Sequence, residues 1–243
     1  MEEVLISSYP RSGNTLLRTI LFQCFGLYSA SAHPNDLGDN VELEHYVGHL
    51  RSDAKGDVKW PPQSRPMFWK RHDLLDYRGP TIYVVRNGRD ATRSLHRFLG
   101  GSTSLDNVIR GETVFGTWAD HVRFWFAKQN GQILLLRYED LTNNLPQTLD
   151  VLSKTLGKPV LNTTLPSREA IVRVDNRWVR AAGDRPDALT QAQDQLFRRI
   201  NGGVMEALGY APTSIPLPDA GGDRTTDESL RHYAVAANLS SKA

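Results

Sequence analysis

The chain of 243 residues has little of three things: cysteine, net charge and long apolar runs. Its single cysteine, Cys24, has no partner for an intrachain disulfide, which fits a reducing compartment. With 29 Lys and Arg residues against 27 Asp and Glu residues, the net charge of +2 gives no general attraction to nucleic acid or to an anionic membrane. Any anion that the protein binds must therefore be held by local groups.

Segments that would direct the chain into or across a membrane are also missing. No run of about 18 apolar residues occurs, so no membrane-spanning helix is expected. The N-terminus is acidic, and the apolar run at residues 4–6 is too short for a secretory signal. We therefore expect a soluble, cytoplasmic protein with no nucleic-acid or membrane partner.

What is present is an alternation of short apolar strands and helical patterns. Strands are predicted at residues 4–9, 67–70, 81–85 and 133–138, and helices at residues 15–25, 90–98, 117–129 and 145–156. Residues 29–66 have weak periodicity, with one short helix near residues 41–50. The alternation predicts a P-loop-like, three-layer α/β fold, in which helices flank a central, mainly parallel sheet. We expect one domain over residues 1–212 and a loosely attached tail over residues 213–243.

The turn after the first predicted strand has the composition of an anion-binding loop. The following helix offers free backbone N–H groups at its start, Gly13 permits close approach of an anion, and Arg11 adds positive charge. Ser12 and Thr15 can add hydroxyl donors. A triphosphate-binding P-loop would need Lys directly after the glycine, but Asn14 stands there. The loop therefore predicts an anion site without a metal.

A second anion site is predicted after the strand at residues 81–85. Arg86 follows this strand, and Ser94 lies eight residues later, on the first turns of the next helix. Both side chains can converge on one phosphate at the carboxyl edge of a parallel sheet. An ATPase would have a metal-holding Asp where Arg86 stands, and no His or Cys cluster has metal-ligand spacing. Two anion sites on neighbouring turns imply one ligand with two separated phosphate-like groups.

In order and context, these segments resemble the sulfotransferase family that uses 3′-phosphoadenosine 5′-phosphosulfate (PAPS). Residues 9–15 are similar to the family's 5′-phosphosulfate loop, Tyr-Pro-Lys-Ser-Gly-Thr-Thr, and residues 86–94 to its 3′-phosphate motif, Arg-Asn-x-Lys-Asp with a later Ser. Residues 115–118, with 121–122, and residues 138–140 are similar to its Tyr-Gly-Ser-Trp and Tyr-Glu-Asp segments. The resemblance covers about residues 4–210.

This resemblance implies transfer of a sulfuryl group from PAPS to a hydroxyl of a small-molecule acceptor, without a metal. The product nucleotide would be 3′-phosphoadenosine 5′-phosphate (PAP). His72 ends a Lys-x-His run in the family's place for the general base, and Lys70 and Arg11 would flank the transferring group. Arg86 and Ser94 would hold the 3′-phosphate. The implied donor-binding residues are Arg11, Ser12, Gly13, Asn14, Thr15, Leu16, Arg86, Ser94, Tyr138, Arg177 and Arg180.

The sequence departs from the family pattern at three places. Arg11 replaces the usual Lys, as it does in several branches of the family, and its planar fork differs from an ammonium. Leu16 stands where animal cytosolic members place a Trp against the adenine, so Tyr138 is a candidate replacement. The family's late loop, Arg-Lys-Gly-x-x-Gly-Asp-Trp, corresponds to a rearranged stretch in which either Arg177 or Arg180 would reach the 3′-phosphate.

Two alternative functions stay open at this point. A P-loop small-molecule kinase would bind ATP together with Mg²⁺, and a catalytically silent protein would bind PAP or PAPS without turnover. The residues identify neither the acceptor nor the oligomeric state, so a homodimer is also left open.

Overall fold

The computed structural model describes residues 3–33, 35–127, 133–176 and 187–210. The elements are β1 (Glu3–Ser7), α1 (Asn14–Phe25), β2 (Ser29–Ser31), η1 (Asp36–Asp39), α2 (Val41–Val47), β3 (His49–Leu50), β4 (Met67–Arg71), β5 (Thr81–Val85), α3 (Gly88–Phe98), α4 (Leu105–Ile109), α5 (Trp118–Ala127), β6 (Ile133–Arg137), α6 (Tyr138–Asn143), α7 (Leu145–Leu156), α8 (Arg168–Val174) and α9 (Gln191–Ala207). Arg177, Arg180 and the tail expected at residues 213–243 lie outside the described residues. None of the described helices is long and apolar enough to span a membrane.

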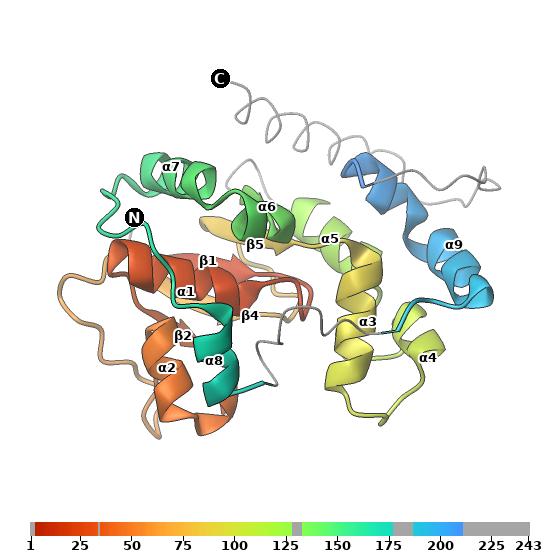
Figure 1. The fold of residues 1–243 in the computed structure, drawn as a ribbon, viewed down its shortest axis with the longest axis horizontal. Coiled ribbons are helices and arrows are strands. Elements are labelled where there is room, and N and C mark those ends of the chain that lie inside the picture. Colours follow the sequence, from red (N-terminus) through yellow and green to blue (C-terminus); the bar gives the residue numbers. More distant parts are fainter. Residues whose placement is uncertain (1–2, 34, 128–132, 177–186, 211–243) are drawn as a thin grey trace.

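A six-stranded sheet forms the centre of the molecule (Figure 1). Its strand order is β3-β2-β4-β1-β5-β6, and every neighbouring pair is parallel. The expected α/β fold with a mainly parallel sheet is therefore confirmed. The four predicted strands are β1, β4, β5 and β6, and they lie next to one another. Strands β2 and β3, from the region expected to be irregular, extend one edge of the sheet.

Helices cover both faces of the sheet because successive side chains of each strand point to opposite faces. From β1 and β5, Leu5 and Tyr83 belong to a core that includes residues of α3, α4, α5 and α9. On the other face, Ile6 and Val84 belong to a core with α1, α6 and α7. All five residues of β5 are buried, as a strand covered on both faces requires.

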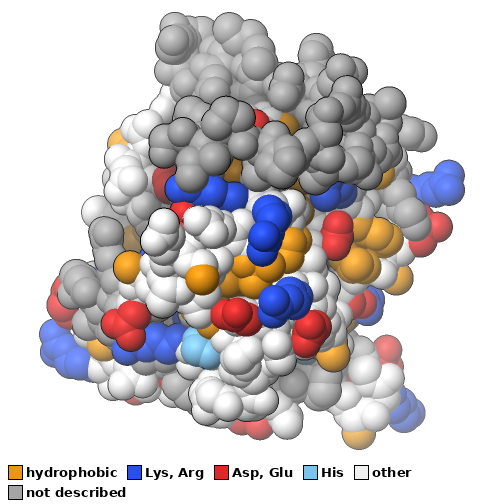
Figure 2. Space-filling model, turned by 90° about the vertical axis from the view of Figure 1, so that its right-hand side faces the viewer, with side chains coloured by type: hydrophobic (Ala, Val, Ile, Leu, Met, Phe, Trp, Pro, Cys, Tyr) orange, Lys and Arg blue, Asp and Glu red, His pale blue; other side chains and the backbone are white. Residues whose placement is uncertain are grey.

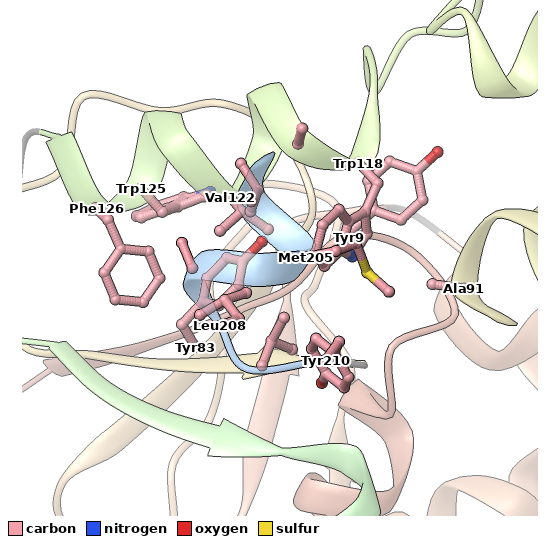
Figure 3. Close-up of a cluster of buried hydrophobic side chains, with 14 of the residues drawn as sticks. Tyr9, Tyr83, Ala91, Trp118, Val122, Trp125, Phe126, Met205, Leu208 and Tyr210 are labelled. Carbon is pink, nitrogen blue, oxygen red and sulfur yellow. The ribbon is translucent and has the colours of Figure 1, made fainter. Parts of the chain in front are cut away.

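The larger core is built around aromatic side chains of α5 (Figure 3). Trp118 and Trp125 are buried on the face of α5 that meets Tyr83 and Met205. Helix α3 begins directly against this cluster. A Cβ atom added to Gly88 would lie 2.7 Å from Cδ2 of Trp118 and 2.9 Å from Cζ of Phe197. Only a glycine at this position lets α3 approach α5 and α9 so closely.

We predict that Gly88→Ala lowers the free energy of unfolding by about 1–3 kcal/mol, because two ring systems in a packed core must move to admit one methyl group. Urea denaturation measures the effect. Gly79→Ala is a matched control, since its added Cβ would meet only the end of the half-buried Tyr77 side chain. Equal losses in both variants would contradict the packing explanation.

Candidate functional site

The loop between β1 and α1 leaves several hydrogen-bonding groups without a partner among the described residues. Arg11 and Gly13 adopt left-handed backbone conformations, with φ of 67° and 108°, and no side chain caps the start of α1. The first backbone N–H groups of the helix are thus available. The hydroxyl of Ser12 is buried with no hydrogen-bond partner among the described residues. A bound anion would satisfy these donors.

Tyr138, the first residue of α6, lies between the two predicted anion sites. A Cβ added to Gly13 would come within 2.6 Å of Cδ2 of Tyr138, so the ring packs directly on the loop backbone. The guanidinium of Arg86 lies 4.4 Å from the centre of the same ring. Leu16 and Tyr138 also pack against the same core. The contact of either residue with adenine stays a prediction.

The two predicted anion sites are in direct contact. Nη1 of Arg86 donates a hydrogen bond to the backbone oxygen of Arg11 over 3.1 Å. Nε of Arg11 donates to the hydroxyl of Ser94, on α3, over 3.3 Å. The structure therefore brings Arg11, Arg86 and Ser94 together at the carboxyl edge of β1 and β5, where α/β sheets bind ligands.

His72 reaches the same loop from the end of β4. Its Nδ1 atom lies 2.8 Å from the backbone oxygen of Ser8. A carbonyl oxygen can only accept, so Nδ1 carries the proton and Nε2 keeps its lone pair. No hydrogen bond to Nε2 joins it to another described residue. The half-buried ring therefore has the tautomer that a base acting through Nε2 needs.

Two further histidines support His72, and neither role was predicted from the sequence. Buried His121 of α5 donates from Nε2 to the backbone oxygen of His72 over 2.8 Å, and its Nδ1 accepts from the hydroxyl of Tyr83 over 2.8 Å. His33 stacks on His72, with ring centres 5.9 Å apart, and its Nε2 accepts from the backbone N–H of His72 over 3.2 Å. The position of His121 in the stretch that resembles the family was the only available indication.

The surroundings keep these imidazoles neutral. Burial, and then the charge of Lys70, hold the pKa of His72 well below its usual value. Burial also lowers the pKa of His121 to about 4. Burial is likewise the main cause of the lowered pKa of His33. A neutral His72 is the form that can accept a proton.

Lys70 is buried on β4, two residues before His72. Its Nζ atom lies 3.1 Å from Oδ1 of Asp36, which the sequence did not single out. The structure therefore places Lys70 in an ion pair beside the site. Its predicted contact with the transferring group stays a prediction.

Figure 2 shows the face at the right of Figure 1, where basic and acidic side chains alternate around a hydrophobic patch. Among the described residues, no group of three or more His, Cys, Asp or Glu side chains could hold a metal ion.

Comparison with known families agrees with this geometry. The family model for the sulfotransferase domain matches residues 1–179. The chain belongs to the sulfotransferase family. The match includes β1 to β6 and every described residue of the site. The domain boundary expected after residue 212 stays a prediction.

Relatives of this chain include two mammalian proteins. Sulfotransferase 1 family member D1 of Mus musculus is 27% identical over 195 residues, which cover 68% of this chain and 63% of the relative. The amine sulfotransferase of Oryctolagus cuniculus is 28% identical over 194 residues, which cover 71% of this chain and 60% of the relative. The chain thus spans less than two thirds of the length of these relatives.

A solved structure with the same fold is mouse sulfotransferase SULT7A1 complexed with PAP. The superposition has a TM-score of 0.50 at 17% sequence identity and covers 97% of this chain and 89% of that one. At this identity the likeness concerns the fold.

The buried side chain of His121 predicts that the stability of the protein falls in mild acid. Its pKa is about 4 in the folded chain and 6.5 for an ordinary histidine. Between these pH values the unfolded chain binds a proton that the folded chain excludes, so the free energy of unfolding drops by up to about 3 kcal/mol as the pH falls. Urea denaturation across this range measures the drop. His121→Gln keeps a donor for His72 and should show a flatter dependence; an unchanged slope would contradict the assignment.

Proposed function

We propose that this protein is a PAPS-dependent sulfotransferase that transfers a sulfuryl group to a hydroxyl of a small-molecule acceptor. One observation carries the proposal: Arg11 joins the 5′-phosphosulfate loop to Arg86 and Ser94 of the 3′-phosphate motif, while His72 is hydrogen-bonded to Ser8 at the start of the same loop. Family membership and the uncapped start of α1 support it.

The donor would lie across the carboxyl edge of β1 and β5. Its 5′-phosphosulfate would accept hydrogen bonds from the backbone at the start of α1 and from Ser12, Asn14 and Thr15. Its 3′-phosphate would pair with Arg86 and Ser94, which distinguishes PAPS from nucleotides without that group. Tyr138 and Leu16 would border the adenine. Arg177 or Arg180 would add a contact from the late loop.

Transfer would proceed in line at sulfur. The acceptor oxygen attacks the sulfur atom, and His72 Nε2 takes the acceptor's proton. The bond between sulfur and the bridging phosphate oxygen breaks, its electron pair stays on that oxygen, and PAP leaves. Arg11 would stabilise the developing negative charge on the bridging oxygen, which replaces proton donation to the leaving group.

We predict that His72→Ala lowers kcat about 10²- to 10⁴-fold and leaves the Kd for PAP within about threefold of wild type, because only general-base catalysis is lost. Initial rates with PAPS and a panel of phenols, alcohols and sugars measure kcat, and calorimetry measures PAP binding. His45→Ala, which removes an exposed imidazole of α2, is the control.

Each alternative gives a different result in this experiment. Wild-type turnover by His72→Ala would show that another group is the base. PAP binding by the wild type without transfer to any acceptor would identify a silent binding protein. Binding of ATP that requires Mg²⁺ would favour a kinase.

We also predict that Arg86→Ala raises the Kd for PAP about 10- to 100-fold, the effect of losing about 1.5–3 kcal/mol from a hydrogen bond to a charged group. The Kd for adenosine 5′-monophosphate, which lacks the 3′-phosphate, should change much less. Arg78→Ala, an exposed arginine before β5, is the matched control. Equal weakening of both nucleotides would mean that Arg86 only supports Tyr138 and the loop.

A further inference from the structure

A buried carboxylate next to the site is shared by two cations. Oδ2 of Asp36 lies 2.6 Å from Nη1 of Arg18, and Oδ1 lies 3.1 Å from Nζ of Lys70. The side chains of Arg18, Asp36 and Lys70 are only 1%, 3% and 7% exposed. The three residues come from α1, η1 and β4. Of the three, only Lys70 was expected beside the transferring group; Asp36 and Arg18 were given no role above.

The backbone at η1 has unfavourable dihedral angles on both sides of Asp36. Asn35, Leu37 and Asp39 have φ of 55°, 62° and 56°. Among the described residues, the only other non-glycine residue with positive φ is Arg11 of the anion-binding loop. Left-handed conformations of such residues cost energy and persist where the surroundings enforce them. In η1, Leu37 is buried, and the ion pairs of Asp36 fix the turn.

The charges of the triad do not cancel. Arg18 also donates to Ser29 and, from Nη2, to Nδ1 of His49. Burial lowers the pKa of His49 to about 4, so its imidazole is neutral and adds no negative charge. Two cations thus share one carboxylate, and one positive charge is left over. A buried excess charge is costly unless an anion can approach it.

Lys70 depends on Asp36 to stay charged. Burial lowers the pKa of the ammonium, Arg18 lowers it further, and Asp36 opposes both effects. The titratable and charged side chains around Lys70 are Arg18, His33, Asp36, His49, His72 and Asp73. Oδ2 of Asp73 lies 2.6 Å from Nη2 of Arg71, so this carboxylate is paired with another cation. The pKa values of the three histidines are lowered, so their rings are neutral. Asp36 is therefore the carboxylate in contact with the ammonium.

Lys70 lies on β4, and His72 is the first residue after that strand, so both side chains arise at the same edge of the sheet. We propose that Asp36, anchored by Arg18, is a positioning residue that holds the Lys70 ammonium beside the reacting groups, where its excess positive charge attracts the oxygens of the transferred sulfuryl group. This inference rests on the proposed sulfotransferase function. It adds Asp36 as the residue that keeps the buried Lys70 side chain charged beside the reacting groups.

The test is the pH dependence of kcat for Asp36→Asn. Asparagine keeps the size of the side chain but removes the charge, so the Lys70 ammonium loses its proton at a lower pH than in the wild type. In the variant, kcat should fall about tenfold for each pH unit above the new pKa of Lys70, and this fall should begin at a lower pH than in the wild type. Adding Lys70→Arg to Asp36→Asn should abolish the fall, because a guanidinium stays charged.

Two controls separate this effect from a structural one. Asp36→Glu keeps the carboxylate and should keep the wild-type profile, as should Asp39→Asn, which alters an exposed carboxylate of the same turn. If Asp36→Asn lowers kcat and the melting temperature without changing the pH profile, Asp36 only stabilises the fold and the inference is wrong.

A second measurement does not require turnover. In protein labelled with ¹³Cε-lysine, the Lys70 signal is the one missing from Lys70→Arg, and its titration should move to lower pH in Asp36→Asn. An unchanged titration would overturn the inference whether or not the enzyme is active. A shifted titration in a protein that transfers no sulfuryl group would contradict the proposed function alone. Asp36 would then still be the counter-ion of Lys70.

Discussion

The central position of β1 in the sheet is the constraint on which the site depends. Because β1 lies between β4 and β5, and all three strands are parallel, the segments that follow them emerge at one edge. The loop after β1 then reaches both neighbours, through Ser8 to His72 and through Arg11 to Arg86. Three stretches separated by dozens of residues in the sequence become one site through this strand order alone.

Much of this arrangement was predictable because the central strands are apolar and closely followed by distinctive turns. The four strands predicted from the sequence, β1, β4, β5 and β6, are neighbours in the sheet and have continuous apolar runs, as burial on both faces demands. Strands β2 and β3 are too short to show a pattern. Helix α9, the longest described, was not predicted; it contains Gly202 and Gly203, which favour helix weakly, and it is held by packing against α3, α4 and α5.

The sequence predicted which residues would lie near the candidate site but not the contacts that join them. Motif resemblance singled out Arg11, His72 and Arg86, and the structure brings all three together. The resemblance assigned no role to Asp36, which lies in a stretch of weak periodicity, among three residues with left-handed backbone conformations, Asn35, Leu37 and Asp39. Nor did it reveal that His121 holds the backbone of His72. Contacts between distant segments produce no periodic pattern in the sequence, so they are seen only in the folded structure.

Burial has opposite consequences for the two groups at the end of β4. A low-dielectric environment disfavours charge, so it keeps the imidazole of His72 neutral and ready to accept a proton. The same environment would discharge Lys70, two residues earlier, and a neutral amine cannot attract sulfuryl oxygens. A base and a cation can share this buried edge only if the cation has its own counter-ion and the base has none. Asp36 contacts Lys70, whereas the protonated nitrogen of His72 faces the uncharged carbonyl of Ser8. The carboxylate of Asp36 thus allows a protonated Lys70 and a neutral His72 to lie two residues apart in the chain.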